Sequence, residues 1–376
     1  MKIMLFETNL NGHRLEYIHH IYMGMLEYTE HEYVIVVPKE FEEKKMLYKW
    51  PKAAHVKFCF FTEKNERNEE GMGLIRHSFH LTKVLRKYVK QEKVESVFLI
   101  SLIDYIIALP FLISSKVNIV GIIYNIYLYI WDSSSWRRRM QDVCKYIIMS
   151  MTPCLKTIFI LNDKSAASRF NKLYYTHKFK FITDPYNVLD YQPRSLRKEL
   201  KISDEDRVYL HFGGLSRRKG TLDILNAVLL IPLEQRRSSV FVFAGKVYDD
   251  LKEEFYQLID LMPSETRMLI YDEFCSNEFL ADLCISSDFI LAPYHITNCS
   301  SGLLGHAAYY GRPVIGPNDG LIGKIIKEYN LGITLSQNSP QCIAKIVAEV
   351  VPYRIESEYI EKINVQNFIN DIFLYL

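Results

Sequence analysis

One segment of the 376-residue sequence has the residue types that bind a diphosphate. An apolar run ends in Gly213 and Gly214, a basic cluster follows, and a third glycine precedes a stretch of helical periodicity. Glycines let backbone amides approach an anion, and cationic side chains near a helix N-terminus add charge. The segment therefore predicts a diphosphate cradle with the cations Arg217, Arg218 and Lys219. A solvated basic turn after a strand is the alternative.

A second segment with anion-binding residue types lies further along the chain. Ser300, Ser301 and Gly302 follow another apolar run and precede a predicted helix. Hydroxyl groups and unpaired amides at a helix start favour phosphate. Two such segments suggest that both hold one pyrophosphate, although Ser-Ser-Gly is also an ordinary helix cap.

In the first half of the chain, the loop from Asn9 to Arg14 follows the first apolar run. Gly12 suits a turn, and His13 or Arg14 has the chemistry to contact a phosphate. No residue of this half is evident as a general base.

Short apolar runs alternate with helical stretches throughout the chain, which is typical of parallel β-α-β units. The runs are residues 2–6, 33–37, 96–100, 119–124 and 157–161 in the first half and 208–212, 240–244, 268–271, 289–292 and 313–315 in the second. They predict two doubly wound, Rossmann-like α/β domains, residues 1–184 and 185–352, with a linker after Asp184. Residues 353–376 are predicted to form a C-terminal helix that packs back on the N-terminal domain. Because ligands of such sheets bind outside the carboxyl ends of the strands, we expect the two domains to face each other across a ligand-binding cleft.

The composition indicates a folded chain with an uneven charge. Hydrophobic residues make up 49% and charged residues 24%, which is too much apolar mass for disorder. Residues 1–183 carry 27 Lys and Arg against 18 Asp and Glu, a net charge of +9, and the remainder carries 19 against 26, a net charge of −7. The basic half suits an anionic membrane surface. Its cations do not form a recognisable nucleic-acid-binding module, so we expect no nucleic-acid partner.

Several patterns concern the compartment in which the protein acts. Seven cysteines occur without a CxxC pair, which favours reduced thiols in the cytoplasm, and the N-terminus reaches polar residues too early for a signal peptide. The apolar stretch 97–115 contains Asp104 and Pro110, so a buried strand, a short helix and a second strand are favoured over a membrane span. The predicted helix 135–155 is basic and amphipathic, which suits either the inner face of the cytoplasmic membrane or an ordinary surface helix.

Four motifs resemble, in order and spacing, the C-terminal domain of GT-B nucleotide-sugar glycosyltransferases of the family-four (group 1) type. They are GGLSRRKG at 213–220, VFVFAG at 240–245, SSDFILAP at 286–293 and HAAYYGRPVIG at 306–316. The linker after Asp184 resembles the proline-asparagine interdomain segment of that family. The resemblance is specific from about Asp184 to Gly332.

The resemblance implies an enzyme of the hexosyltransferase type that moves a sugar from a nucleoside diphosphate sugar to a glycan or a lipid-linked glycan. Retention of the anomeric configuration is implied as well. Stabilisation of the leaving diphosphate by Lys219, a neighbouring arginine and the amides of residues 300–302 predicts a reaction without a metal or other cofactor. With the residue chemistry above, the resemblance assigns catalytic roles to Lys219, Arg217 and His13. Nucleotide-sugar binding is assigned to Gly12, Gly213, Gly214, Arg218, Phe274, Asn298, Ser300, Ser301, Gly302 and His306.

Three positions depart from the pattern of that family. Gly214 stands where the family usually has an arginine, so Arg217 or Arg218 is expected to substitute. Asn298 and His306 stand at the two ends of a motif that normally begins and ends with glutamate. Asn298 is expected to contact the sugar, and His306 either hydrogen-bonds the ribose or only packs in its helix.

Two alternatives to a sugar transferase remain. The absence of both motif glutamates is compatible with a catalytically inactive nucleotide-sugar-binding subunit or regulator of glycan assembly. A sugar-nucleotide epimerase would use the same fold and pocket without a second substrate.

Overall fold

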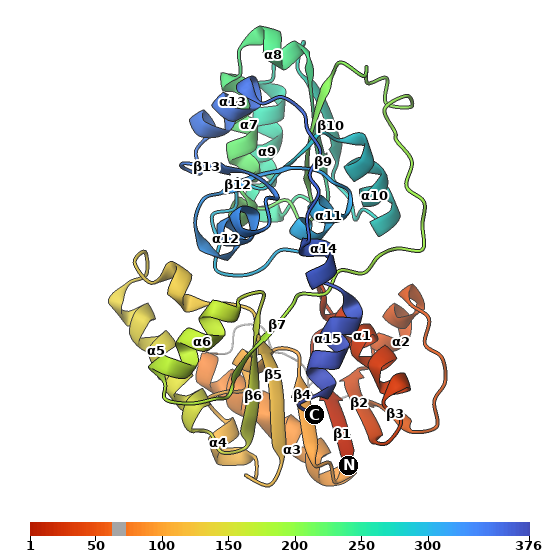
Figure 1. Cartoon of the computed structure of the whole chain (residues 1–376), viewed down its shortest axis with the longest axis vertical. Helices are drawn as coiled ribbons and strands as arrows, with labels where there is room; N and C mark the ends of the chain where they lie inside the picture. Colours follow the sequence, from red (N-terminus) through yellow and green to blue (C-terminus); the bar gives the residue numbers. More distant parts are fainter. Residues whose placement is uncertain (62–72) are drawn as a thin grey trace. The chain divides into compact units, whose positions relative to one another are not determined.

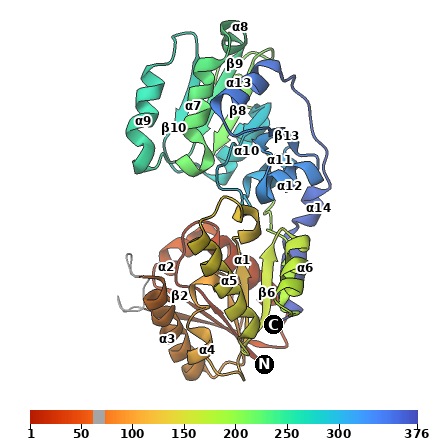
Figure 2. The same cartoon turned by 90° about the vertical axis from the view of Figure 1, so that its left-hand side faces the viewer.

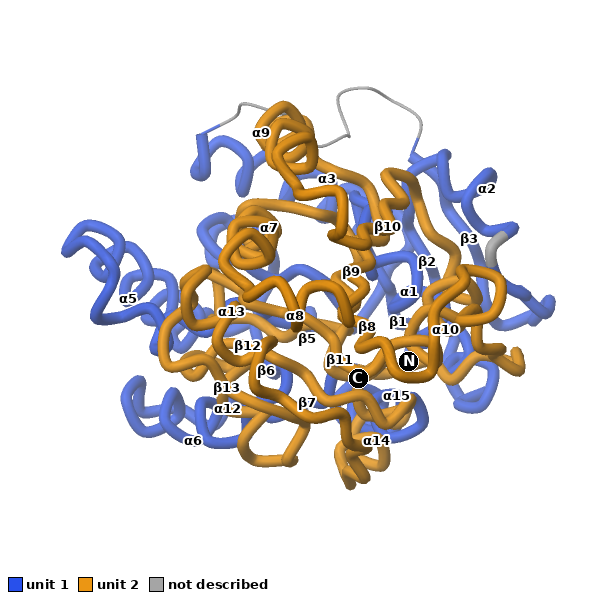
Figure 3. The backbone as a smooth tube through the Cα atoms, turned by 90° about the horizontal axis from the view of Figure 1, so that it is seen from above, with its two compact units in different colours: residues 1–184, 365–376 blue, residues 185–364 orange. Residues whose placement is uncertain are grey.

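The computed structural model describes residues 1–61 and 73–376, which divide into two compact units. The first unit comprises residues 1–184 and 365–376 and the second residues 185–364, coloured separately in Figure 3. Residues 353–364, which we grouped with the C-terminal helix, lie with the second unit. There the Ile355 amide donates to the Gly311 carbonyl (3.3 Å), and the Tyr186 amide donates to the Ile363 carbonyl (2.7 Å).

The first unit contains a sheet of parallel strands in the order β3-β2-β1-β4-β5-β6-β7 (Figure 1). The strands are β1 (Lys2–Phe6), β2 (Glu32–Pro38), β3 (Val56–Phe61), β4 (Ser96–Leu99), β5 (Asn118–Ile123), β6 (Leu155–Leu161) and β7 (Phe179–Ile182). In register, Leu5 of β1 lies between Ile35 of β2 and Phe98 of β4. The direction in which the chain adds strands reverses between β1 and β4, so the two strands flank a topological switch point.

Helices cover both faces of this sheet. They are α1 (Arg14–Glu27), α2 (Phe41–Lys44), α3 (Leu74–Glu92), α4 (Leu109–Leu112), α5 (Trp136–Met151), α6 (Lys164–Leu173) and α15 (Val365–Phe373), with 3-10 turns η1 (Lys45–Leu47), η3 (Leu102–Asp104) and η4 (Tyr127–Ile130). Successive strand residues point to opposite faces. Leu5 therefore joins the core beneath α1 and α15, whereas Phe6 contacts Tyr88 of α3 with ring centroids 6.3 Å apart. Figure 2 looks onto the side that carries α3, α4 and α5.

Helix α15 packs beside α1, although the two are far apart in sequence (Figure 1). Phe368 stacks on Tyr17 at 5.3 Å between ring centroids. A β-carbon at Gly24 would lie 2.5 Å from the ring of Phe373, so this glycine permits the close approach of the two helices. The C-terminal segment thus completes the core of the first unit.

The apolar stretch 97–115 forms buried strand β4, turn η3 and short helix α4, as expected. Strand β5 follows directly and is also buried. Within residues 1–61 and 73–376, no helix combines the length and the apolar character needed to cross a bilayer.

The second unit contains a parallel sheet in the order β10-β9-β8-β11-β12-β13. The strands are β8 (Arg207–Phe212), β9 (Ser239–Ala244), β10 (Arg267–Tyr271), β11 (Phe289–Leu291), β12 (Val314–Pro317) and β13 (Gly332–Leu335). The helices are α7 (Thr221–Leu230), α8 (Leu233–Arg237), α9 (Asp249–Asp260), α10 (Asn277–Ser286), α11 (Leu303–Tyr309), α12 (Gly320–Glu328), α13 (Pro340–Glu349) and α14 (Tyr359–Lys362), with the 3-10 turn η5 (Arg217–Lys219).

The centre of the second core is aromatic. Tyr209 of β8 stacks between Phe241 of β9 and Phe289 of β11, each 5.4 Å away between ring centroids. The strand order reverses between β8 and β11, which places a second switch point there. The predicted pair of doubly wound, Rossmann-like units is confirmed.

Candidate functional site

The basic turn, residues 213–220, leaves the carboxyl end of β8 at the switch point of the second unit. Lys219 folds back over the turn, and its Nζ donates a hydrogen bond to the Phe212 carbonyl (3.2 Å). Gly213 has a φ of +84°, and a β-carbon there would lie 2.5 Å from Lys219 Nζ. Because an ammonium group has three donors, Lys219 keeps donor capacity beyond its bond to Phe212. The basic turn therefore holds Lys219 beside its glycine backbone, and the predicted diphosphate cradle stays a prediction.

A buried histidine anchors the basic turn to the sheet. His211 Nδ1 lies 2.8 Å from the Leu291 carbonyl of β11, and its Nε2 lies 2.9 Å from Thr221 Oγ1. A carbonyl only accepts, so Nδ1 carries the proton and Nε2 accepts from the Thr221 hydroxyl. The Ser216 amide in turn donates to Thr221 Oγ1 (3.0 Å). His211 thus ties β11, the start of α7 and the basic turn together.

We expect His211 to make stability depend on pH. Burial lowers the pKa of His211 to about 3, whereas an unfolded histidine titrates near 6.5. The imidazole is neutral in both states above that value. Below that value the unfolded chain binds a proton that the folded chain excludes. The free energy of unfolding therefore decreases as the pH drops, until the pH reaches the pKa of His211 in the folded state. When the pH falls from 7 to 5, the free energy of unfolding of the wild-type protein should decrease by about 2 kcal/mol more than that of His211→Gln.

Urea denaturation of the full chain at the two pH values measures this difference. His211→Gln itself should be destabilised by about 1–3 kcal/mol at neutral pH, because the Thr221 hydroxyl and Leu291 carbonyl lose a fitted partner. Parallel loss of stability in both proteins as the pH falls would show that His211 titrates normally.

The serine loop, residues 293–302, leaves β11 on the other side of the same switch point. The His295 amide donates to the Arg218 carbonyl (2.9 Å), and the His295 ring lies 2.7 Å from Asp223 of α7. Lys219 Nζ and the Arg218 guanidinium each lie 5.7 Å from the centroid of the Tyr294 ring. Tyr294 Oη is 3.3 Å from Ser301 Oγ. The two predicted anion-binding segments are therefore in direct contact.

Asn298 and His306, which stand at the two positions where the motif described above has glutamates, lie in different surroundings. Asn298 is buried in the serine loop, and its Oδ1 has no hydrogen-bond partner among the described residues. His306 lies on α11, where its ring packs edge-on against Phe212 at 5.3 Å, and its Nδ1 is 3.3 Å from Tyr186 Oη. His306 therefore reaches the carboxyl end of β8 and also has the packing contacts of the alternative interpretation.

Two other predicted residues lie apart from Lys219. Arg217 turns to α9, where its guanidinium is 2.7 Å from Glu254 and 3.8 Å from Asp250. Phe274 follows β10 and is 89% exposed. Gly214 lies within the basic turn, where an added β-carbon would meet the Tyr248 ring at 2.9 Å.

In the first unit, Gly12 and His13 lie in the loop after β1. Gly12 has a φ of +64°, and an added β-carbon would meet no atom of the described residues within 4 Å. His13 is exposed and lies 3.3 Å from Glu16, which is also near His20. Burial favours the neutral acid, but the hydrogen bond with His13 and the nearby His20 ring lower the pKa of Glu16 to about 2. The loop thus presents His13 next to a stable negative charge.

Sequence reasoning missed a charged cluster at the switch point of the first unit. Glu7 directly follows β1, is 2% exposed, and accepts a hydrogen bond from Arg14 (2.8 Å). The amides of Thr8 and Asn9 also donate to Glu7, at 2.8 and 2.9 Å. Arg14 lies 3.8 Å from Asp104, which follows β4. Burial raises the pKa of Glu7 although Arg14 opposes that effect. The signal available in the sequence was a carboxylate directly after the apolar residues 3–6 of β1.

The fold and both switch points together define a class of structure: two doubly wound units that carry polar and charged residues where ligands of such sheets bind. This is the GT-B architecture. No protein-family model and no curated protein sequence matches the chain. Solved structures match it over nearly its whole length.

Among these structures, Anabaena HepE in complex with UDP has a TM-score of 0.71 and 13% sequence identity, and the match covers 99% of this chain and 98% of that chain. WaaG, a glycosyltransferase involved in lipopolysaccharide biosynthesis, has a TM-score of 0.65 and 13% identity over 93% of this chain and 90% of that chain. A putative UDP-N-acetylglucosamine 2-epimerase from Listeria monocytogenes has a TM-score of 0.61 and 12% identity over 99% and 94%. These likenesses confirm the GT-B fold.

Proposed function

We propose that the protein is a glycosyltransferase that uses a nucleoside diphosphate sugar as donor. The observation that carries the proposal is the contact between the basic turn and the serine loop at one switch point, with Lys219 above Gly213. A pyrophosphate needs cations and amide donors that converge from more than one segment. Solved structures of HepE, which shares the fold, contain UDP-glucose and UDP.

In the proposed reaction, the bond between the anomeric carbon and the diphosphate oxygen breaks, and the acceptor oxygen bonds to that carbon. Negative charge grows on the leaving diphosphate, where Lys219 and the amides of the basic turn and the serine loop stabilise it. The acceptor proton passes to the departing phosphate oxygen, and the new bond forms on the face that the diphosphate leaves, with retention. Asn298 supports a contact with the donor, because a buried Oδ1 without a partner gains from a ligand donor.

The remaining roles are assigned by place in the fold. Arg218 shares the Tyr294 ring with Lys219 and is proposed to bind the diphosphate, while Arg217 is proposed to act only after leaving its ion pair with Glu254. His13 and Arg14 follow β1 and are proposed to serve the acceptor side, with Glu7 fixing Arg14. Stabilisation by Lys219 and amides requires no metal in this scheme, and chelator should leave the rate unchanged.

The acceptor is proposed to be a glycan or a lipid-linked glycan at the cytoplasmic face of a membrane. The seven free cysteines favour a reducing compartment. Helix α5 carries Arg137, Arg138 and Arg139 together with exposed apolar residues, which supports peripheral contact with an anionic bilayer.

The direct test is incubation of the full chain with a panel of nucleotide sugars and acceptor extracts, with nucleoside diphosphate release as the readout. Release that depends on acceptor supports transfer. Release of an isomerised sugar nucleotide without acceptor would instead indicate an epimerase. Silence across the panel, together with measurable nucleotide binding, would favour the inactive subunit, which Asn298 and His306 in place of the motif glutamates also support.

A further inference from the structure

A gap in the helical layer of the first unit carries the inference. The connection from β4 to β5 contains only turn η3 and the four-residue helix α4, whereas the neighbouring helices α3 and α5 have 19 and 16 residues. A full-length helix would normally cover that part of the sheet and the facing sides of its neighbours. Here part of those facing sides lines a pocket.

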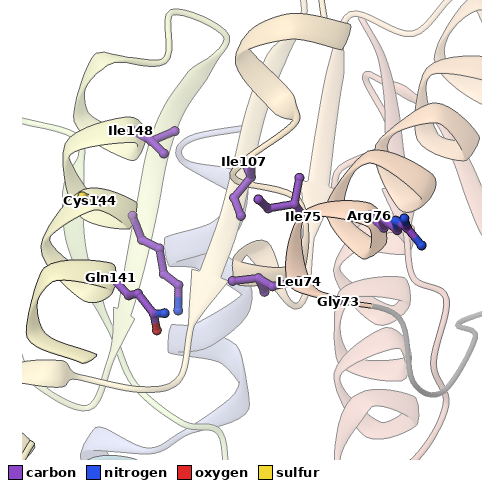
Figure 4. A pocket seen from close by; sticks show the side chains of 9 residues that line it. Gly73, Leu74, Ile75, Arg76, Ile107, Gln141, Cys144 and Ile148 are labelled. Carbon is purple, nitrogen blue, oxygen red and sulfur yellow. The ribbon is translucent and has the colours of Figure 1, made fainter. Parts of the chain in front are cut away.

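The pocket between α3 and α5 has a volume of about 620 Å³, which is within the range of ligand sites. Its wall is apolar, with Leu74 and Ile75 from α3, Ile107 from the segment before α4, and Ile148 from α5. Figure 4 shows these side chains directed into the space between the two helices. Lys145 of α5 also lines the pocket and adds a cationic group to the apolar wall, whereas the Arg76 side chain points away from the space between the helices (Figure 4).

The exposed face of α5 continues this apolar surface. Its residues are spaced four, four, three and four positions apart, which places them on one side of a helix: Trp136, Met140, Cys144, Ile147 and Met151. Trp136 is 70% exposed and Met151 is 75% exposed. Phe111 of α4, which stacks on Phe79 of α3, adds a further exposed ring. We call these α5 residues the apolar stripe.

The charges around the stripe select its partner. Arg137, Arg138 and Arg139 lie at its start, and the carboxylate of Asp142 pairs with Arg138 (3.1 Å) and Lys145 (3.5 Å). Anionic phospholipids attract such cations, and tryptophan is enriched at bilayer interfaces.

We propose that the pocket between α3 and α5 binds one acyl chain of an anionic phospholipid, while the apolar stripe lies at the bilayer surface. This inference adds to the membrane contact proposed above, and it does not depend on the donor chemistry. Lys145 holds the lipid phosphate, and the isoleucine and leucine side chains surround the hydrocarbon. The site is separate from the basic turn and the serine loop, which belong to the second unit.

The test is calorimetric titration of the full chain with monoacyl phosphatidylglycerol below its micelle concentration. We expect saturable binding of one lipid per chain. Cys144→Trp fills the pocket and should weaken binding at least about tenfold, because the hydrocarbon loses its apolar surroundings. Met140→Trp is the matched control, since it adds the same side chain to the same stripe without lining the pocket, and it should bind as the wild type does.

Lys145→Gln examines the charged part of the site. This variant should bind the anionic lipid about fivefold more weakly and should bind monoacyl phosphatidylcholine as the wild type does. Equal binding by Cys144→Trp and Met140→Trp, or a titration that never saturates, would overturn the pocket. So would binding to anionic vesicles without binding of the single lipid, or concentration-dependent dimerisation without any lipid binding. Titration of both variants with UDP separates these results from a failure of the donor site.

Discussion

Lys219→Met is expected to lower the rate of sugar transfer by about 10²–10³-fold, the range found when one group that stabilises developing charge is removed. Lys219 Nζ lies next to Gly213 and near the Tyr294 ring, where the two anion-binding segments meet. Methionine keeps the length and apolar stem of lysine and removes its charge. Because the charge on the diphosphate grows as the donor bond breaks, we expect a larger effect on kcat than on donor affinity.

Steady-state kinetics with the donor found in the panel measures this effect, with Arg217→Met as the matched control. Arg217 belongs to the same turn, but its guanidinium pairs with Glu254 and Asp250 of α9, so its loss should reduce the rate much less. An equal loss in both variants would contradict the special position of Lys219. Retention of assembly with no loss of turnover in Lys219→Met would favour a non-catalytic role.

Gly220→Ala is expected to destabilise the second unit by at least about 2 kcal/mol and to weaken donor binding. Gly220 has a φ of +71°, which is unfavourable for alanine. An added β-carbon would also lie 2.3 Å from the Pro293 carbonyl oxygen, so the basic turn and the serine loop could not keep their contact. The amide of His295 would then lose its place at the Arg218 carbonyl.

Gly12→Ala is the control for the backbone conformation. Gly12 has a similar φ of +64°, but its added β-carbon would have no neighbour within 4 Å in the part of the chain that the structure describes. The free energy of unfolding of Gly12→Ala should decrease by only about 1 kcal/mol, because only the left-handed backbone conformation is unfavourable for alanine. Thermal unfolding and calorimetric titration with UDP compare the two variants. Equal destabilisation would mean that the contact with Pro293 relaxes without cost.

The sequence predicted all central strands but only one of the four edge strands, β10, for a physical reason. Strands such as β1 and β9 are buried on both faces and therefore appear as unbroken apolar runs. The three strands without a predicted counterpart, β3, β7 and β13, all lie at sheet edges. There the polar Lys57 and Lys180 interrupt the apolar run, and β13 is only four residues long.

The candidate site was also predicted only in part. The basic turn and the serine loop were found because their glycines and arginines are local in sequence. The cluster of Glu7, Arg14 and Asp104 was not, because Asp104 reaches the loop after β1 only through the pairing of β1 with β4. The pocket beside α5 was likewise not found, because it depends on how α3 and α5 pack on either side of the short helix α4.

The return of α15 to the first unit has a consequence for how the protein is made. Residues 365–376 are translated after every residue of the second unit, so that unit has all of its sequence available on the ribosome before the first one does. Until then the groove along α1 that receives Phe368 and Ile372 is uncovered. A nascent chain held at this stage should therefore be a preferred client of chaperones that recognise apolar surface.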